Sequence, residues 1–409
     1  MNLKDLYVSY AKDITDAPEQ FHQALSYFMV SSVIGKNVFM PFGYKKLYPN
    51  LYILIGAPSS LHRKSWSQSM AVHLIEIIKP SLEIHETSSR EAFIAELADE
   101  ERVPSETGIV AIDELGGFLN RIKHKRHFEG FMQDLSSAYD NRKIIRRVGA
   151  TNETKKIHTI QEPFLNLTAA CSLDWLTKSA ETDDISGGFL ARFLWIIEDK
   201  KIRSPKDEPG NEDPEKKQKI IQQLNHISNF VGMAEFEPKT RTKWQEWYSG
   251  FRGNYQGGKW DANYERLTVI AKKLAVLNAI MRYAEIEQAP LNGKLFINTE
   301  DLVEAQLFVE STIASFSKVV IGDNKHDVLA QKVILFIRKM PTYTATRSEV
   351  LRGVRGLDAW TFGNITKTLI QSDQIEVSEV ISGAGKPVVI YKYVGLNGQN
   401  PELDRVRRS

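Results

Sequence analysis

The sequence predicts an α/β protein with a three-layer core, helical segments before and after that core, and a small C-terminal domain. Short apolar runs at 51–55 and 109–112 have the composition of strands buried on both faces of a parallel sheet. Helical patterns lie between these runs, which is the alternation expected of strand–helix–strand units. The chain of 409 residues is also too long for one hydrophobic core, so two or three domains are expected.

The composition is that of an ordinary folded protein, 42% hydrophobic and 25% charged, with a formal net charge of +2. This charge neither favours nor excludes nucleic acid, so any basic surface must be local. The single cysteine, Cys171, excludes an intramolecular disulfide and a cysteine-based zinc site. The N-terminus lacks the order of a signal peptide, and no apolar run approaches the roughly 20 residues of a membrane span. We therefore expect a cytoplasmic protein without membrane association.

The domain boundaries follow from changes in pattern along the chain. Apolar residues recur at helical spacing near the N-terminus, a stretch rich in proline and charge follows residue 200, and helical patterns resume until about residue 320. The expected parts are an N-terminal helical segment at 1–45, an α/β core at 46–200, a charged linker at 201–217, a helical lid at 218–322, a C-terminal domain at 325–396 and a disordered tail at 397–409.

The C-terminal domain has the element order of a winged helix. Helices are predicted at 328–339, after Thr346 and at 358–372, and a hairpin of two alternating strands is predicted at 375–394. The third helix of such a domain often enters a DNA groove, which makes Lys367 a candidate DNA contact. Docking of a protein partner is the alternative.

The first predicted strand leads into a candidate phosphate-binding loop. In such a loop, backbone amides and the positive end of a helix surround the phosphates, a lysine reaches the terminal oxygens, and a hydroxyl holds Mg²⁺. Gly56 lies eight residues before Lys64, two more than usual, and Arg63 replaces the usual glycine, which is acceptable only if its backbone avoids the left-handed region. The alternative is an ordinary turn with an incidental Lys-Ser pair. The residues predicted to bind nucleotide here are Gly56, Ser59, Ser60, Arg63, Lys64 and Ser65.

A second motif lies about fifty residues downstream, where the apolar run 109–112 ends in Asp113 and Glu114. In a site of this type the aspartate, with Ser65, organises Mg²⁺, and the glutamate polarises the attacking water. A buried strand ending in a polar turn is the alternative for this motif alone. Both motifs together, in this order, predict a site for ATP and Mg²⁺.

Two further residues are candidates for roles in phosphoryl transfer. Ser172 follows the apolar strand at 164–170, would lie between the two motif strands, and would sense the γ-phosphate; a helix cap is the alternative. Arg192 lies within an apolar segment, so it either pairs internally or points into a neighbouring subunit as an arginine finger. Cys171 has no signature of a nucleophile.

The richest basic region lies between these motifs and is predicted to form a hairpin with cations on both arms. This arrangement suits contact with a nucleic-acid backbone, and a solvated charged face is the alternative. The predicted DNA contacts are Arg142, Lys143, Arg146, Arg147, Lys155 and Lys156.

The segment 47–56, the Arg-Lys-Ser at 63–65, the acidic pair and the Gly-Phe-Leu-Ala-Arg-Phe at 188–193 resemble a bacterial family of P-loop ATPases. That family is catalogued as a domain of unknown function and occurs in phages, plasmids and mobile elements. Its members often tolerate a residue other than glycine before the lysine. The resemblance spans about residues 1–320.

The Leu-Ala-Arg-Phe segment also resembles the finger segment of minichromosome-maintenance-type AAA+ helicases. This resemblance implies an AAA+ or RecA-like P-loop core, a helical lid and a winged helix. It also implies Arg192 as a finger acting in trans, Ser172 as the first sensor, and Arg266 or Lys273 as the second.

We therefore expect an ATP-dependent DNA motor, a ring-forming helicase that acts on single-stranded or forked DNA with a replication or mobile-element partner protein. The resemblance to ring helicases implies a homo-oligomer, a hexamer. One alternative is a DNA-binding replication initiator or helicase loader with a weak or inactive nucleotide site. Another is an ATPase signalling module of phage defence.

Overall fold

A computed structural model provides the coordinates of the chain. It describes residues 1–58, 62–86, 89–124, 130–148, 156–179, 188–199, 206, 208–254, 261–288, 290, 292–321, 329–330, 332–334, 336–337, 340–371, 374–381 and 387–394. The chain divides into two compact units, Met1–Val319 and Val320–Ser409. Among the described residues, no helix is both long and apolar enough to cross a bilayer.

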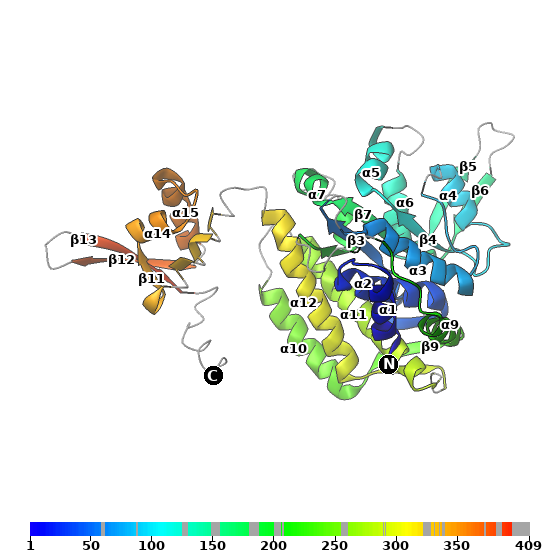
Figure 1. Cartoon of the computed structure of the whole chain (residues 1–409). Helices are drawn as coiled ribbons and strands as arrows, with labels where there is room; N and C mark the ends of the chain where they lie inside the picture. Colours follow the sequence, from blue (N-terminus) through cyan, green and yellow to red (C-terminus); the bar gives the residue numbers. More distant parts are fainter. Residues whose placement is uncertain are drawn as a thin grey trace. The chain divides into compact units, whose positions relative to one another are not determined.

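A parallel sheet lies within the first unit, and β3, β4 and β7 are labelled in Figure 1. The order of its strands is β4-β7-β3-β8. Its strands are β3 (Tyr52–Ala57), β4 (Thr107–Ile112), β7 (Phe164–Ser172) and β8 (Phe193–Ile197). Glu83 adds a parallel bridge to Ile109, beyond β4. The chain is therefore an α/β protein built on a parallel sheet, as the apolar runs predicted.

Helices cover both faces of this sheet. Successive side chains of a strand point to opposite faces, so a strand such as β3, which is buried at every position, is covered on both. Ile53 and Ile55 of β3 join the large core formed with α1 (Leu3–Ile14), α2 (Glu19–Ile34), α3 (Lys64–Ile78), α9 (Pro214–Ser228) and α11 (Asp261–Glu285). Tyr52 points the other way and donates a hydrogen bond to the Leu135 carbonyl, 2.7 Å away, in α6 (Phe131–Tyr139). The helices α5 (Leu115–His124) and α7 (Leu173–Ser179) contact β7 as α6 does.

A second, smaller sheet joins regions that are far apart in the sequence. Its order is β10-β9-β1-β2, in which β1 (Val38–Phe42) pairs in parallel with β9 (Gly232–Phe236) and antiparallel with β2 (Lys45–Leu47), while β10 (Lys294–Ile297) completes the sheet. The regions 1–45 and 218–322, expected to be helical, thus contain strands as well. The remaining helices of the second region are α10 (Pro238–Asn254) and α12 (Thr299–Ile321).

The helix starts show ordinary capping chemistry. The Asn2 side chain accepts a hydrogen bond from the Asp5 amide at the start of α1, and Asp213 accepts from the first amides of α9. The helix α9 begins at Pro214, within the stretch 201–217 expected to be a linker. Asn298 accepts from the Asp301 amide at 2.8 Å, which agrees with the predicted helix start there.

An antiparallel hairpin of β5 (Ile144–Val148) and β6 (Lys156–Ile160) lies beside α4 (Arg90–Leu97). The expected basic hairpin is therefore present, with Ile144 paired to Ile160 at its buried base.

The second unit has a core of its own around Phe362, Ile365 and Tyr391. Its sheet has the order β11-β13-β12, with β11 (Thr344–Thr346), β12 (Ile375–Ile381) and β13 (Pro387–Tyr393) all antiparallel. The helices α14 (Arg347–Gly353) and α15 (Ala359–Gln371) precede the long hairpin. Sequence patterns predicted α14, α15 and the hairpin but not β11. The helix expected at 328–339 and the tail at 397–409 fall partly or wholly outside the described residues.

Candidate functional site

The predicted phosphate loop connects β3 to α3. Every residue of β3 is buried, and α3 begins at Lys64. Arg63, the residue before the helix, has φ 44° and ψ 44°. The condition set for an arginine in a phosphate loop, a backbone outside the left-handed region, is therefore not met: Arg63 adopts the conformation that glycine usually supplies.

The Arg63 guanidinium is held by two groups from outside the loop. Its Nε lies 2.7 Å from Asp16 Oδ1, and its Nη2 donates to the Lys206 carbonyl at 2.8 Å. The Arg63 guanidinium is therefore engaged by groups outside the loop, Asp16 and the Lys206 carbonyl.

Lys64 turns back over the end of β3. Its ammonium donates to the carbonyls of Ala57 and Pro58 at 3.1 and 3.2 Å. Burial lowers the pKa of Lys64, and the negative charge of Glu114 opposes that shift. A half-buried ammonium that bonds only to neutral carbonyls in the described structure is able to exchange them for an anion.

Of the other predicted loop residues, Ser65 is exposed in the first turn of α3, and Ser59 and Ser60 lie outside the described residues. Gly56 is inside β3, paired with Cys171 and Ile197. A Cβ on Gly56 would lie 2.4 Å from the Ile197 Cδ1 atom. The close packing of the Ile197 and Leu176 side chains, and not a turn, therefore favours glycine here.

The acidic pair follows β4 directly. Asp113 and Glu114 are both exposed between β4 and α5. The Asp113 amide donates to Glu86 Oε2 at 3.1 Å, and Glu114 Oε1 accepts from the Gly116 amide at 3.3 Å. Both carboxylates thus lie at the carboxyl end of the strand.

Ser172 lies at the end of β7, the strand between β3 and β4, as the sequence predicted. It is paired in register with Ala57, and Ile112 is paired with Ala169. Carboxyl ends of parallel strands meet at one edge of a sheet. Lys64, Ser172 and the Asp113–Glu114 pair therefore converge on this edge, which we call the carboxyl edge.

Cys171, next to Ser172, is buried, and burial raises the pKa of its thiol. A thiol with a raised pKa is a poor nucleophile, which agrees with the absence of a nucleophile signature.

Two residues near the carboxyl edge were missed. His62 is 2% exposed, and neither ring nitrogen has a hydrogen-bond partner within the described structure. Glu86 accepts the Asp113 amide and lies 3.6 Å from Arg121. The position of His62 within the predicted loop could have marked it as a site residue. Nothing in the sequence around Glu86 marks it in that way.

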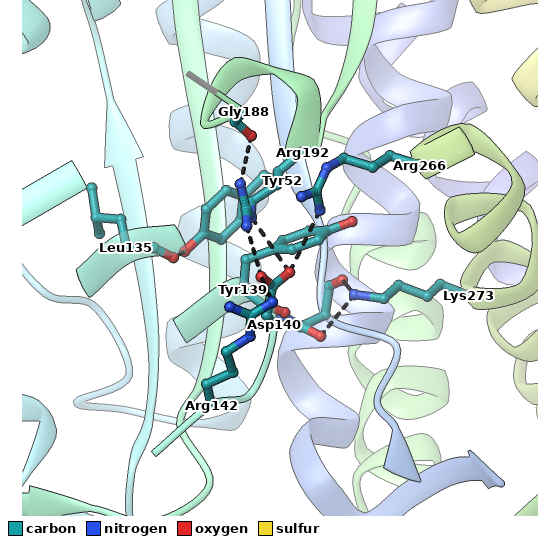
Figure 2. A network of polar contacts seen from close by, with 10 residues as sticks. Tyr52, Leu135, Tyr139, Asp140, Arg142, Gly188, Arg192, Arg266 and Lys273 are labelled. Carbon is teal, nitrogen blue, oxygen red and sulfur yellow. Dashed lines mark hydrogen bonds and ion pairs between the residues drawn. The ribbon is translucent and has the colours of Figure 1, made fainter. Parts of the chain in front are cut away.

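The residues predicted as finger and second sensor lie together around Asp140 and Tyr139 (Figure 2). They are at the opposite edge of the sheet from Lys64, where β3 and β8 begin. Arg192 precedes β8, and Phe193 is level with Tyr52, the first residue of β3. The six residues of β3 span about 17 Å, since a parallel strand rises roughly 3.3 Å per residue. None of these side chains at this amino edge therefore reaches Lys64 of the same chain.

Three arginines gather on Asp140 at the amino edge. Arg192 is 9% exposed; its Nη2 lies 2.7 Å from Asp140 Oδ2, and its Nη1 donates to the Gly188 carbonyl at 2.6 Å. Arg142 and Arg266 lie 3.2 and 3.6 Å from the same carboxylate. The internal ion pair, one of the two alternatives for Arg192, is thus present, and the finger role stays a prediction.

The Asp140 pKa reflects these neighbours. Burial alone would raise this pKa, but hydrogen bonds and charge from Arg192, with the charges of Arg266 and Arg142, hold it below its usual value. Asp140 is therefore an anion firmly held by cations.

Lys273 is enclosed at the amino edge. Its ammonium donates to the backbone and side-chain oxygens of Asn50 at 2.8 and 2.9 Å and lies 4.1 Å from the centre of the Tyr139 ring (Figure 2). Burial lowers the Lys273 pKa to about 7. A buried amine in this position cannot contact a phosphate at Lys64 of its own chain, so Lys273 acts here as a core hydrogen-bond donor.

The predicted DNA contacts differ in whether their side chains are exposed or already paired within the chain. Lys143 and Arg142 are exposed, whereas Arg146 is paired with the buried Asp134, which also binds Arg90 at 2.7 Å. Arg147 and Lys156 lie on β5 and β6, and Lys155 is outside the described residues. In the second unit, Lys367 is exposed on α15.

No group of three or more His, Cys, Asp or Glu side chains suited to a metal ion occurs among the described residues. Comparison of the chain with models of known families and with curated proteins finds no match.

Proposed function

We propose that this chain is a P-loop ATPase that acts on DNA, with nucleotide bound at the carboxyl edge of the sheet. One observation carries the proposal: the strand order β4-β7-β3-β8 brings Lys64, Ser172 and the Asp113–Glu114 pair to adjacent strand ends. These groups are far apart in the sequence. Ligands of parallel sheets bind outside the carboxyl ends of the strands, which supports this location.

Each residue at this edge suits one task. Lys64 neutralises terminal phosphate charge, Glu114 orients the attacking water, and Ser172 senses the γ-phosphate. Ser65 and Asp113 offer oxygen ligands of the kind Mg²⁺ prefers, and bound Mg²⁺ would neutralise further phosphate charge. Since Mg²⁺ is commonly held by one carboxylate and the phosphates themselves, a cage of several acidic residues is not needed.

The wider proposal is an AAA+-like helicase that forms a ring on single-stranded or forked DNA. Neither Arg192 nor Arg266 reaches Lys64 of its own chain, so a role in phosphoryl transfer would be on nucleotide held by a neighbouring subunit, and Arg192 would have to exchange its Asp140 ion pair to take it. The region 218–322 would form the lid, and the second unit would be the winged helix. Its order of helices and antiparallel strands supports that interpretation.

A second candidate is a DNA-binding replication initiator or helicase loader whose site binds nucleotide with little turnover. The left-handed Arg63, bonded to Asp16 and the Lys206 carbonyl, favours it. A loop held by its own chain has less freedom to close on phosphates.

The test is ATP turnover of the full chain with and without single-stranded DNA, with the oligomer mass measured in nucleotide. We expect Lys64→Ala and Glu114→Gln each to lower turnover about a hundredfold or more. Lys79→Ala, at the other end of α3, is the matched control and should keep the parent rate. Binding of ATP without turnover would favour the second candidate, and hydrolysis at the parent rate by both site variants would refute the proposal.

A further inference from the structure

The residue before Lys64 has a backbone conformation that its side chain disfavours. The Arg63 backbone is in the left-handed region, where a Cβ comes too close to the following carbonyl oxygen. Glycine has no Cβ and avoids this contact. Arg63 is also the N-cap residue of α3, and its own side chain makes no capping hydrogen bond. The direction of the chain at Arg63 therefore sets the orientation of Lys64 and Ser65.

A network of three groups holds Arg63 in place. Asp16, whose side chain is 3% exposed, binds Arg63 Nε through Oδ1 at 2.7 Å and accepts the Lys206 amide on Oδ2 at 3.3 Å. The Lys206 carbonyl accepts from Arg63 Nη2 at 2.8 Å, which closes the ring of contacts. Fixing both the carboxylate and the guanidinium restricts where the Arg63 backbone can go.

Asp16 is itself fixed by the fold. It lies in the short connection between α1 and α2, where Thr15 ends α1 and accepts the Ala17 amide at 3.2 Å. Both helices are part of the main core. A contact from this connection is thus rigidly placed relative to β3 and α3.

We propose that Asp16 is a positioning residue for the phosphate loop: through Arg63 it maintains the left-handed turn that glycine provides in loops of the usual sequence. This inference rests on the proposed function, because its consequence is nucleotide binding. It assigns the N-terminal segment a role in the nucleotide site, although Asp16 does not touch nucleotide. It also makes a specific prediction: ATP binding should depend on Asp16 only while residue 63 is an arginine.

The experiment is a double-mutant cycle in the full chain, with Mg·ATP as the titrant. Asp16→Ala should weaken ATP binding about tenfold, because the turn is no longer maintained. Arg63→Gly should bind within about threefold of the parent, since glycine adopts the turn unaided. The double variant should bind like Arg63→Gly, which a merely structural role of Asp16 would not produce.

Asp13→Ala is the matched control, because Asp13 lies in the last turn of α1, is bonded to Lys216 and should not alter binding when removed. Melting temperatures of the parent and the three variants of the cycle give a second readout: the part of the Asp16→Ala loss that comes from Arg63 should be absent when residue 63 is glycine, while the loss of the Asp16–Lys206 hydrogen bond remains. Parent-like binding by Asp16→Ala, or a double variant as impaired as Asp16→Ala, would overturn the inference. If the parent binds no nucleotide, the proposed function fails, while the melting cycle still decides whether Asp16 acts through Arg63.

Discussion

Removing the carboxylate of Asp140 should destabilise the first unit far more than removing its main partner, Arg192. The Asp140 carboxylate pairs with three guanidinium groups. Its oxygens lie 2.7 Å from an Arg192 nitrogen, 3.2 Å from an Arg142 nitrogen and 3.6 Å from an Arg266 nitrogen. In Asp140→Ala the nearly buried Arg192 loses this ion pair, and its repulsion from Arg266 is no longer offset. In Arg192→Met the carboxylate keeps two cations, and methionine fills part of the space.

The magnitude follows from the burial of the pair. Breaking a buried ion pair by removing one partner costs about 3–5 kcal/mol, because the other charge is left uncompensated. Arg192 keeps its hydrogen bond to the Gly188 carbonyl, so we expect the low end, about 3 kcal/mol, for Asp140→Ala. For Arg192→Met we expect about 1 kcal/mol, the usual net value of a hydrogen bond.

Urea unfolding of the full chain, followed by tryptophan fluorescence, measures both values. The double variant should cost less than the sum of the single variants, because the unpaired charge is absent. The Asp140 pKa is lower in the folded state, so its stabilisation is present above pH about 4 and is lost as pH falls through the folded value. Equal losses in the two single variants, or a loss below about 1 kcal/mol in Asp140→Ala, would refute this reasoning.

Three further outcomes are expected. Lys273 loses its proton near pH 7 in the folded chain, whereas the unfolded chain keeps it to about pH 10.4. The free energy of unfolding should therefore rise by about 1 kcal/mol per pH unit between about pH 7 and 9. Lys273→Met should flatten that rise in urea titrations. Gly56→Ala would place a Cβ 2.4 Å from Ile197 Cδ1 and should cost about 1–3 kcal/mol in the same assay; no loss would contradict the packing reason. Lys143→Glu should weaken binding of single-stranded DNA severalfold and lower the salt dependence of that binding, whereas Lys243→Glu, at another exposed lysine, should not. Identical binding curves for the two variants would count against the hairpin as the DNA contact.

The parallel sheet was predictable because its strands carry their own signal. The runs at 51–55 and 109–112 are apolar at every position, as strands covered on both faces must be. Once those strands are parallel, the meeting of Lys64 with Asp113 and Glu114 follows from the geometry of the sheet. The basic hairpin was likewise visible, because two cationic segments stand on either side of the turn-forming residues 149–152.

The small sheet and the ion pairs were not predictable, because they depend on residues distant in the sequence. The strand β1 pairs with β9 across almost two hundred residues, and both are short. Asp16 and Asp140 resemble any surface acids until the fold brings them to Arg63 and Arg192, which are 47 and 52 residues away. Lys273 was a candidate second sensor on a lid helix, but Asn50 and Tyr139 enclose it.

Calorimetric titration of Mg·ATP into the parent, Lys64→Ala and Lys79→Ala tests the central claim most directly. A phosphate site at the carboxyl edge predicts that the parent and Lys79→Ala bind alike and that Lys64→Ala binds at least tenfold more weakly, a loss of about 1.4 kcal/mol or more. Equal binding by all three proteins, or no binding by the parent, would contradict a nucleotide site built on Lys64.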